Sequence, residues 1–237
     1  MLIQSCARTD RGLLRDGNED ALLCDPKRRL FAVADGMGGH AAGEVASAMA
    51  IERLESVHPP HTAETLTRAV HAANEAILAA GRESPGRSGM GTTVTILALR
   101  DSEAVWAHVG DSRLYLYRNQ QLSQLTRDQT WVQQQVDAGL LTPEQARVHP
   151  RSSLLSQALG MPEPIEPETG RLQFYPGDRF LLCSDGLTGM LRDHDIAAIL
   201  ADHASCESAV RELIERANQQ GGTDNITAVL VDLPATH

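Results

Sequence analysis

Aspartates recur in this chain at the ends of short apolar runs, where their side chains can meet at one edge of a sheet. FAVADG reaches Asp35, WAHVGDSR contains Asp111, FLLCSDG contains Asp185, and Asp224 precedes the apolar run ITAVLV. A buried carboxylate costs several kcal/mol unless a counter-charge or a metal ion neutralises it. One Asp-Gly pair is typical of a turn. Aspartates repeated in this way, together with Asp20 in NED, favour a cation site.

Oxygen atoms are the expected ligands of this site, because the sequence has no cysteine or histidine cluster at zinc spacing. Oxygen ligands select hard ions, so we expect Mg²⁺ or Mn²⁺. Two such ions, bridged by one carboxylate, can hold a hydroxide nucleophile and clamp a transferring phosphoryl group. The glycines that follow Asp35 would let the Gly36 carbonyl approach a metal ion or its water, and they leave room for a phosphoryl substrate.

Hydrophobic patterns predict the elements that must position these aspartates. Strands are expected at 29–34, 92–100, 103–113, 114–126, 170–175, 178–186 and 226–233, and helices at 43–56, 62–83, 192–202 and 205–219. Thr62 is the expected N-cap of its helix, and residues 92–126 predict a β meander. Strands and helices fall in blocks, which favours an α+β fold, with helices covering antiparallel sheets, over a doubly wound parallel fold.

A glutamine-rich stretch, residues 128–160, is interrupted by Pro143 and Pro150. This composition predicts short helices in a mobile surface segment. Neither a linker nor an internal repeat divides the 237 residues, so we expect a single domain, 1–237.

Charge and composition exclude several classes of function. A net charge of −10 disfavours binding to nucleic acid or to an anionic membrane surface. Lys27 is the only lysine and no GxxxxGK[ST] motif exists, which excludes a P-loop nucleotide site and a lysine-dependent kinase site. No apolar run approaches the roughly 20 residues that span a bilayer. We therefore expect a soluble, cytoplasmic protein, and a monomer.

The four cysteines, Cys6, Cys24, Cys183 and Cys206, are scattered, with no CxxC pair. MLIQSC lacks the basic segment and the long apolar run of an export signal. We therefore expect reduced thiols in a cytosolic protein. Cys183, inside an apolar run, is expected to be a packed small hydrophobe.

Six motifs resemble those of the metal-dependent serine/threonine protein phosphatases of type 2C (PPM), and most of all the compact bacterial members. In order, they are RDGNEDA, VADGMGGHAAGE, GMGTTV, HVGDSR, LLCSDGL and GGTDNITAVLV, and the resemblance extends from about residue 5 to 233. It implies a four-layer αββα sandwich, in which two packed antiparallel sheets are flanked by helical layers, with a binuclear metal centre at one edge. It also implies a flap-like helical insertion at about 128–160.

Metal-binding roles follow from the resemblance, residue by residue. Asp35 would bridge two Mn²⁺ or Mg²⁺ ions, and Asp185 with Asp224 would complete one site. Asp20 and the Gly36 carbonyl would serve the other site, directly or through water.

Two further residues match family positions with distinct roles. Asp111 matches the position of a third, weaker ion in bacterial members. Arg15 matches the phosphate-binding arginine, whose planar fork can grip two phosphate oxygens of the substrate. With Asp35, it forms the expected catalytic pair.

The sequence departs from relatives at two positions. Met37 stands where many eukaryotic relatives have a histidine proposed as general acid. His40 and a metal-bound water are the alternative proton donors. Gln129 stands where bacterial relatives commonly carry histidine, which removes a titratable group near the flap.

The resemblance implies a phosphatase that hydrolyses phosphoserine and phosphothreonine in proteins by direct attack of metal-activated water. Two alternatives are a catalytically silent phosphoprotein-binding module of the same fold and a metal-dependent phosphohydrolase of small phosphate esters. By analogy with the family, the partners would be a bacterial Ser/Thr kinase or its substrates, with forkhead-associated proteins among the candidate clients. We expect neither a nucleic-acid nor a membrane partner.

Overall fold

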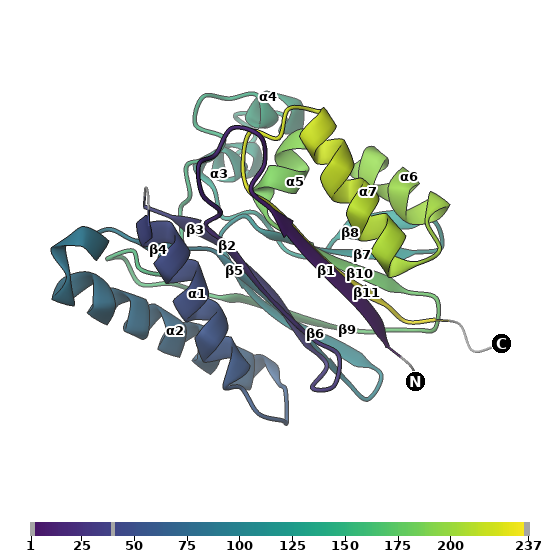
Figure 1. The fold of residues 1–237 in the computed structure, drawn as a ribbon, viewed down its shortest axis with the longest axis horizontal. Coiled ribbons are helices and arrows are strands. Elements are labelled where there is room, and N and C mark those ends of the chain that lie inside the picture. Colours follow the sequence, from purple (N-terminus) through teal and green to yellow (C-terminus); the bar gives the residue numbers. More distant parts are fainter. Residues whose placement is uncertain (1–2, 39–40, 235–237) are drawn as a thin grey trace.

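Two antiparallel sheets form the centre of the molecule (Figure 1). The structure is a computed structural model, which describes residues 3–38 and 41–234. The first sheet consists, in spatial order, of β1 (Gln4–Asp10), β11 (Ile226–Asp232), β10 (Arg179–Cys183), β7 (Arg113–Arg118) and β8 (Gln121–Gln124). The second consists of β2 (Asp20–Asp25), β3 (Leu30–Met37), β5 (Val94–Arg100), β6 (Glu103–Val109) and β9 (Glu168–Gln173), and β4 (Gly91–Thr92) pairs with β3.

Helices cover the outer face of each sheet (Figure 1). The second sheet is covered by α1 (Ala41–Glu55) and α2 (Ala63–Glu83), and the first by α5 (Asp185–Met190), α6 (Asp193–Asp202) and α7 (Cys206–Gln219). The remaining helices are η1 (Pro85–Arg87), α3 (Trp131–Asp137) and α4 (Pro143–Arg147). Thr62 caps α2 as predicted, since its side chain accepts from the Thr65 N–H. In the two described ranges, no helix has the length and apolar character needed to cross a membrane.

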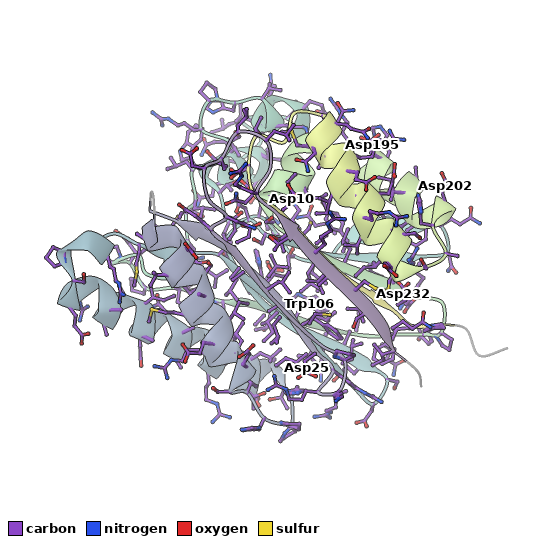
Figure 2. The ribbon with its side chains drawn as sticks, in the orientation of Figure 1. Asp10, Asp25, Trp106, Asp195, Asp202 and Asp232 are labelled. Atoms are coloured by element: carbon purple, nitrogen blue, oxygen red, sulfur yellow. A yellow bond between two sulfur atoms is a disulfide. The ribbon has the colours of Figure 1, made fainter. Side chains whose placement is uncertain are left out.

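Apolar side chains fill the three interfaces of the sandwich: one between the two sheets, and one between each sheet and the helices that cover it. Phe31, Trp106 and Phe180 belong to the layer between the sheets, and Figure 2 labels Trp106 there. Leu66 and its neighbours on α2 pack with the second sheet, and Leu213 on α7 packs with the first. Burying one such side chain contributes about 1.5–3 kcal/mol. The predicted αββα sandwich is confirmed.

Strands β1 and β2, which the sequence patterns did not predict, carry the chain to the site. They belong to different sheets, so the loop between them, residues 11–19, runs from one sheet to the other. On β2, Asp20 lies opposite Asp35 of β3 in the antiparallel register. Figure 2 labels Asp10 at the end of β1, where this loop begins.

The predicted β meander is wrong at its centre. The pairs β5–β6 and β7–β8 are antiparallel, as expected, but β6 and β7 lie in different sheets. The chain crosses between them at Gly110, which has φ +111°. A Cβ at Gly110 would come within 2.6 Å of the Thr93 side chain, so this crossing requires glycine.

The expectation of four reduced thiols is also wrong, because Cys6 and Cys206 form a disulfide between β1 and the start of α7. Their Cα atoms are 5.6 Å apart, a distance that a disulfide spans. The packing of α7 on β1 brings together two residues that are 200 positions apart. Cys24 and Cys183 are free, and Cys183 is buried as predicted.

Candidate metal centre and phosphate site

The predicted metal-binding aspartates come together at one edge of the sandwich. Asp20 begins β2, Asp35 lies in β3, Asp111 follows β6, Asp185 begins α5 directly after β10, and Asp224 precedes β11. Asp35 is buried. Its pKa is raised well above the usual range, first by burial and then by the charges of four neighbours: Asp20, Asp185, Asp111 and Asp224. These carboxylates repel one another in the absence of a cation, which a metal ion would relieve.

Asp20 has one satisfied and one unsatisfied oxygen. Its Oδ2 accepts hydrogen bonds from Ser184 Oγ at 2.7 Å and from Thr227 Oγ1 at 2.6 Å. Its Oδ1 is buried and has no hydrogen-bond partner among residues 3–38 and 41–234. Burial raises the pKa of Asp20 to about 7, and the nearby charge of Asp185 adds to this shift. Because a buried acceptor without a donor is costly, this oxygen fits a metal ligand.

Gly36 lies in a space that only glycine fits. Its N–H donates to the Glu19 carbonyl at 3.1 Å, and a Cβ would clash with the carbonyl oxygens of Glu19 and Gly43. The start of α1 therefore packs closely against the end of β3. The close approach that this glycine allows is to the protein backbone, and the approach of the Gly36 carbonyl to a metal ion stays a prediction.

The cluster is not a formed coordination sphere. Within the part of the chain that the structure describes, no three His, Cys, Asp or Glu side chains are arranged so that they could hold a metal ion as they stand. Repulsion between carboxylates disfavours such an approach without a counter-charge. The donor chemistry fits Mg²⁺ or Mn²⁺, because the converging side chains offer oxygen atoms and Asp20 Oδ1 lacks a donor.

Arg15 reaches this cluster from the loop between β1 and β2. Its Nη2 donates to Asp224 Oδ2 at 2.6 Å, and its side chain is 53% exposed. A half-exposed guanidinium that touches one carboxylate of the cluster is well placed to meet a phosphoryl group from solvent.

Asn225 holds the Arg15 loop, a role that the sequence interpretation missed. Its Nδ2 donates to the carbonyls of Arg11 and Gly17, both at 2.9 Å, and its Oδ1 accepts from the Glu19 N–H at 2.8 Å. Asn225 is 5% exposed, so these bonds are shielded from water. In the sequence, only its position next to Asp224 indicates that Asn225 has a role at the site. Ser184 and Thr227, which support Asp20, were missed in the same way.

A cavity of about 520 Å³ opens beside the cluster. Asp111 and Asp185 line it, and α3 and α4 contribute further lining from the predicted flap segment. Arg113, also in the lining, forms a two-bond ion pair with Asp128 at 2.8 and 2.6 Å. A substrate wider than a phosphate would meet this cavity.

Both positions at which the sequence departs from relatives can be placed. Met37 ends β3, and Gln129 accepts from the Gly110 N–H through its Oε1 at 2.9 Å. Gln129 therefore joins the start of the 128–160 segment to the crossing between the sheets. The hypothesis that His40 transfers a proton concerns a residue outside the ranges that the structure describes.

Comparison with known proteins gives consistent matches over nearly the whole chain. The family model "Protein phosphatase 2C" matches residues 14–231. The serine/threonine protein phosphatase PstP of Mycobacterium tuberculosis is 44% identical, over 98% of this chain and 45% of that protein, so this chain spans about half of its length. The protein phosphatase PhpP of Streptococcus pneumoniae is 36% identical over 95% of both chains.

Solved structures show the same architecture. A crystal structure of the M. tuberculosis phosphatase PstP/Ppp has a TM-score of 0.93 at 42% identity, covering 99% of this chain and all of that one. The catalytic domain of PstP in complex with two manganese ions has a TM-score of 0.90 at 40% identity, covering 98% and 99%. The edge at which the aspartates of this chain converge thus belongs to a fold that holds manganese in a relative.

Proposed function

This chain belongs to the protein phosphatase 2C family of serine/threonine protein phosphatases, and from that premise we propose that it hydrolyses phosphoserine and phosphothreonine in proteins by direct attack of metal-activated water. The observation that carries the proposal is the carboxylate cluster around Asp35, in which the buried Asp20 Oδ1 has no hydrogen-bond donor among the described residues. When bound, the metal ions would supply a water of lowered pKa and neutralise charge on the phosphoryl group.

We assign the metal ligands from this cluster. Asp35 would bridge two ions, Asp185 and Asp224 would complete one site, and Asp20 with the Gly36 carbonyl would serve the other. The register that sets Asp20 opposite Asp35 supports the shared site. Arg15 would grip the oxygens of the phosphoryl group, which its half-exposed position beside Asp224 supports.

A third, weaker ion would bind at Asp111. Asp111 is buried, and burial together with the charge of Asp185 raises its pKa well above the usual range, so a cation there would relieve repulsion. Asp111→Ala is expected to leave two tight metal equivalents and to lower kcat. Metal occupancies from anomalous diffraction, with kinetics on the same variant, test this. Full activity with two ions would remove the third ion from catalysis, and loss of the tight pair would place Asp111 in the binuclear core.

The remaining assignments concern organisation and partners. Residues 1–237 would act as one catalytic domain, with 128–160 as a flap beside the cavity that α3 and α4 line. The partners would be a bacterial Ser/Thr kinase or its substrates, including forkhead-associated proteins, and the domain would act as a monomer in the cytoplasm. Thiol titration of protein isolated from cells tests this location: reduction of the Cys6–Cys206 disulfide to two further free thiols would support the cytoplasm, and an intact disulfide would contradict it.

Phosphate release from a phosphothreonine peptide tests the function. Release is expected with Mn²⁺ and not after chelation, and Asp35→Asn provides the inactive control. Binding of the peptide without release would support a catalytically silent phosphoprotein-binding module. Hydrolysis of small phosphate esters alone would support the small-ester phosphohydrolase.

A further inference from the structure

The loop between β1 and β2 holds two large apolar side chains in solvent beside Arg15. Leu13 is 62% exposed and Leu14 is 70% exposed. Single exposed leucines are common on protein surfaces. Two in succession, directly before the residue proposed to hold the phosphoryl group, place two exposed apolar side chains next to the site. We call Leu13 and Leu14 the leucine pair.

The backbone of this loop is tied down on both sides of the leucine pair. Asn225 bonds the carbonyls of Arg11 and Gly17, and the Leu13 N–H donates to the Gly222 carbonyl at 2.7 Å. Gly12 packs so closely against the Asp224 carbonyl that no Cβ fits there. In Figure 1, the loop after β1 and the segment after α7 lie side by side at this end of the sheets.

These hydrogen bonds keep the loop from burying its two leucines. A flexible loop could bury its leucines by folding back, but this one would first have to break the bonds to Asn225 and Gly222. The leucine pair is therefore held in water by the fold. A rigid apolar surface loses little conformational entropy when a partner covers it, which favours binding.

We propose that the leucine pair docks the polypeptide of the substrate, and that it selects phosphoproteins with an apolar side chain next to the phosphorylated serine or threonine. The proposal rests on the proposed function, in which Arg15 holds the phosphoryl group. Leu14 and Leu13 are one and two residues before Arg15, and neighbouring Cα atoms are about 3.8 Å apart, so the leucine pair lies within reach of a residue next to the phosphorylated one. Leucine side chains offer neither charge nor hydrogen bonds, so their complement is apolar.

Two phosphothreonine peptides of equal length and charge test the proposal. One carries leucine on both sides of the phosphothreonine and the other carries serine. With Mn²⁺, the ratio of their kcat/KM values is expected to favour the leucine peptide by about tenfold, the effect of burying roughly one leucine side chain. The double variant Leu13→Ser, Leu14→Ser is expected to reduce this ratio to about one, mainly through KM of the leucine peptide.

Tyr175→Ser is the control, because Tyr175 is 52% exposed and lies between β9 and β10, outside both the loop and the flap. It is expected to keep the tenfold preference. An equal loss of preference in this control would overturn the assignment to the leucine pair, as would a parent protein that does not distinguish the peptides. Sedimentation of the parent and the double variant tests whether a second copy of the chain covers the leucine pair instead. A dimeric parent and a monomeric double variant would assign the surface to that second copy and overturn the proposal.

The proposed function and the docking proposal fail in different ways. If neither peptide nor p-nitrophenyl phosphate is hydrolysed with Mn²⁺, the proposed function is wrong and the docking proposal falls with it. If all three are hydrolysed and the peptides are equivalent, only the docking proposal is wrong. Residual hydrolysis of the serine peptide by the double variant reports that this variant is folded.

Discussion

Arg15 Nη2 and Asp224 Oδ2 lie 2.6 Å apart and join residues that are 209 positions apart in the chain. The residue proposed to hold the phosphoryl group therefore rests against a residue proposed to hold a metal ion. The contact keeps the guanidinium aimed at the carboxylate cluster before any substrate arrives. An entering phosphoryl group has to share or replace this hydrogen bond.

Arg15→Ala is expected to raise KM for a phosphopeptide by about tenfold or more, because charge-assisted contacts to phosphate are lost from the ground state. Binding of Mn²⁺, measured by calorimetry, should remain. Arg15→Lys is the matched variant, since it keeps the charge but loses the planar fork, and an intermediate KM is expected. A KM within twofold of the parent in Arg15→Ala would contradict the role.

Asn225→Ala tests whether this asparagine acts through Arg15. It removes three buried hydrogen bonds from the loop, so KM is expected to rise about fivefold and the free energy of unfolding to fall by about 1–3 kcal/mol. In an Arg15→Ala background, Asn225→Ala should change KM little further, because the loop no longer carries the arginine. Thr223→Ala, in the same segment but outside this network, is the control. Additive effects on KM would assign Asn225 to stability alone.

Asp35→Asn is expected to reduce turnover to near background, since it removes the charge that two cations would share. Calorimetric titration should show Mn²⁺ affinity reduced by about tenfold or more. The fold should persist, because the uncharged amide relieves repulsion in the cluster. Unchanged turnover and affinity would contradict the assignment of Asp35.

The raised pKa of Asp20 predicts how the free energy of unfolding of the metal-free protein changes with pH. The Asp20 pKa of about 7 in the folded protein exceeds the usual aspartate value of 3.8, so the folded state binds the proton more tightly than the unfolded state does. The stabilisation of the folded state by proton binding at Asp20 is fully present below about pH 3.8 and is lost as pH rises through about 7. Metal-free parent protein should therefore lose more stability between pH 5 and pH 7.5 than metal-free Asp20→Asn does.

Urea unfolding in the presence of a chelator measures this difference. The comparison with Asp20→Asn is needed because His108 has the opposite sign: burial lowers its pKa to about 4, so it favours the folded state as pH rises from about 4 to about 6.5. Saturating Mn²⁺ should reverse the contribution of Asp20, since the ion requires the ionised carboxylate. Parallel pH profiles of parent and variant would contradict the prediction.

Elements with strong periodicity could be predicted from the sequence. The apolar stripe of α2 and its Thr62 cap correspond to a helix that ends at Glu83, as expected. Strands β1 and β2 were not predicted because QSCARTD and DALLCD are half-exposed edge strands whose polar residues hide the alternation. The apolar pattern predicts a strand over 178–186, whereas the short helix α5 begins at Asp185, because six residues do not reveal a helical period.

The aspartates of the candidate site could be predicted from the sequence, but the polar residues that support them could not. The aspartates could be found because buried acids after apolar runs are unusual. Asn225, Ser184 and Thr227 could not be found, because asparagine, serine and threonine near the end of an apolar run are also typical of turns. The disulfide joins residues too far apart in the chain for any local pattern to reveal it.

The two sheets contribute to the candidate site from opposite sides. Asp20 and Asp35 belong to strands of the second sheet, whereas Asp185 and Asp224 flank strands of the first. Metal ions bound by aspartates of both sheets would link the two sheets at this edge and stabilise their packing. Their loss would therefore be felt beyond the site, as faster amide hydrogen exchange in the apolar layer around Trp106 and Phe180 as well as in the loops.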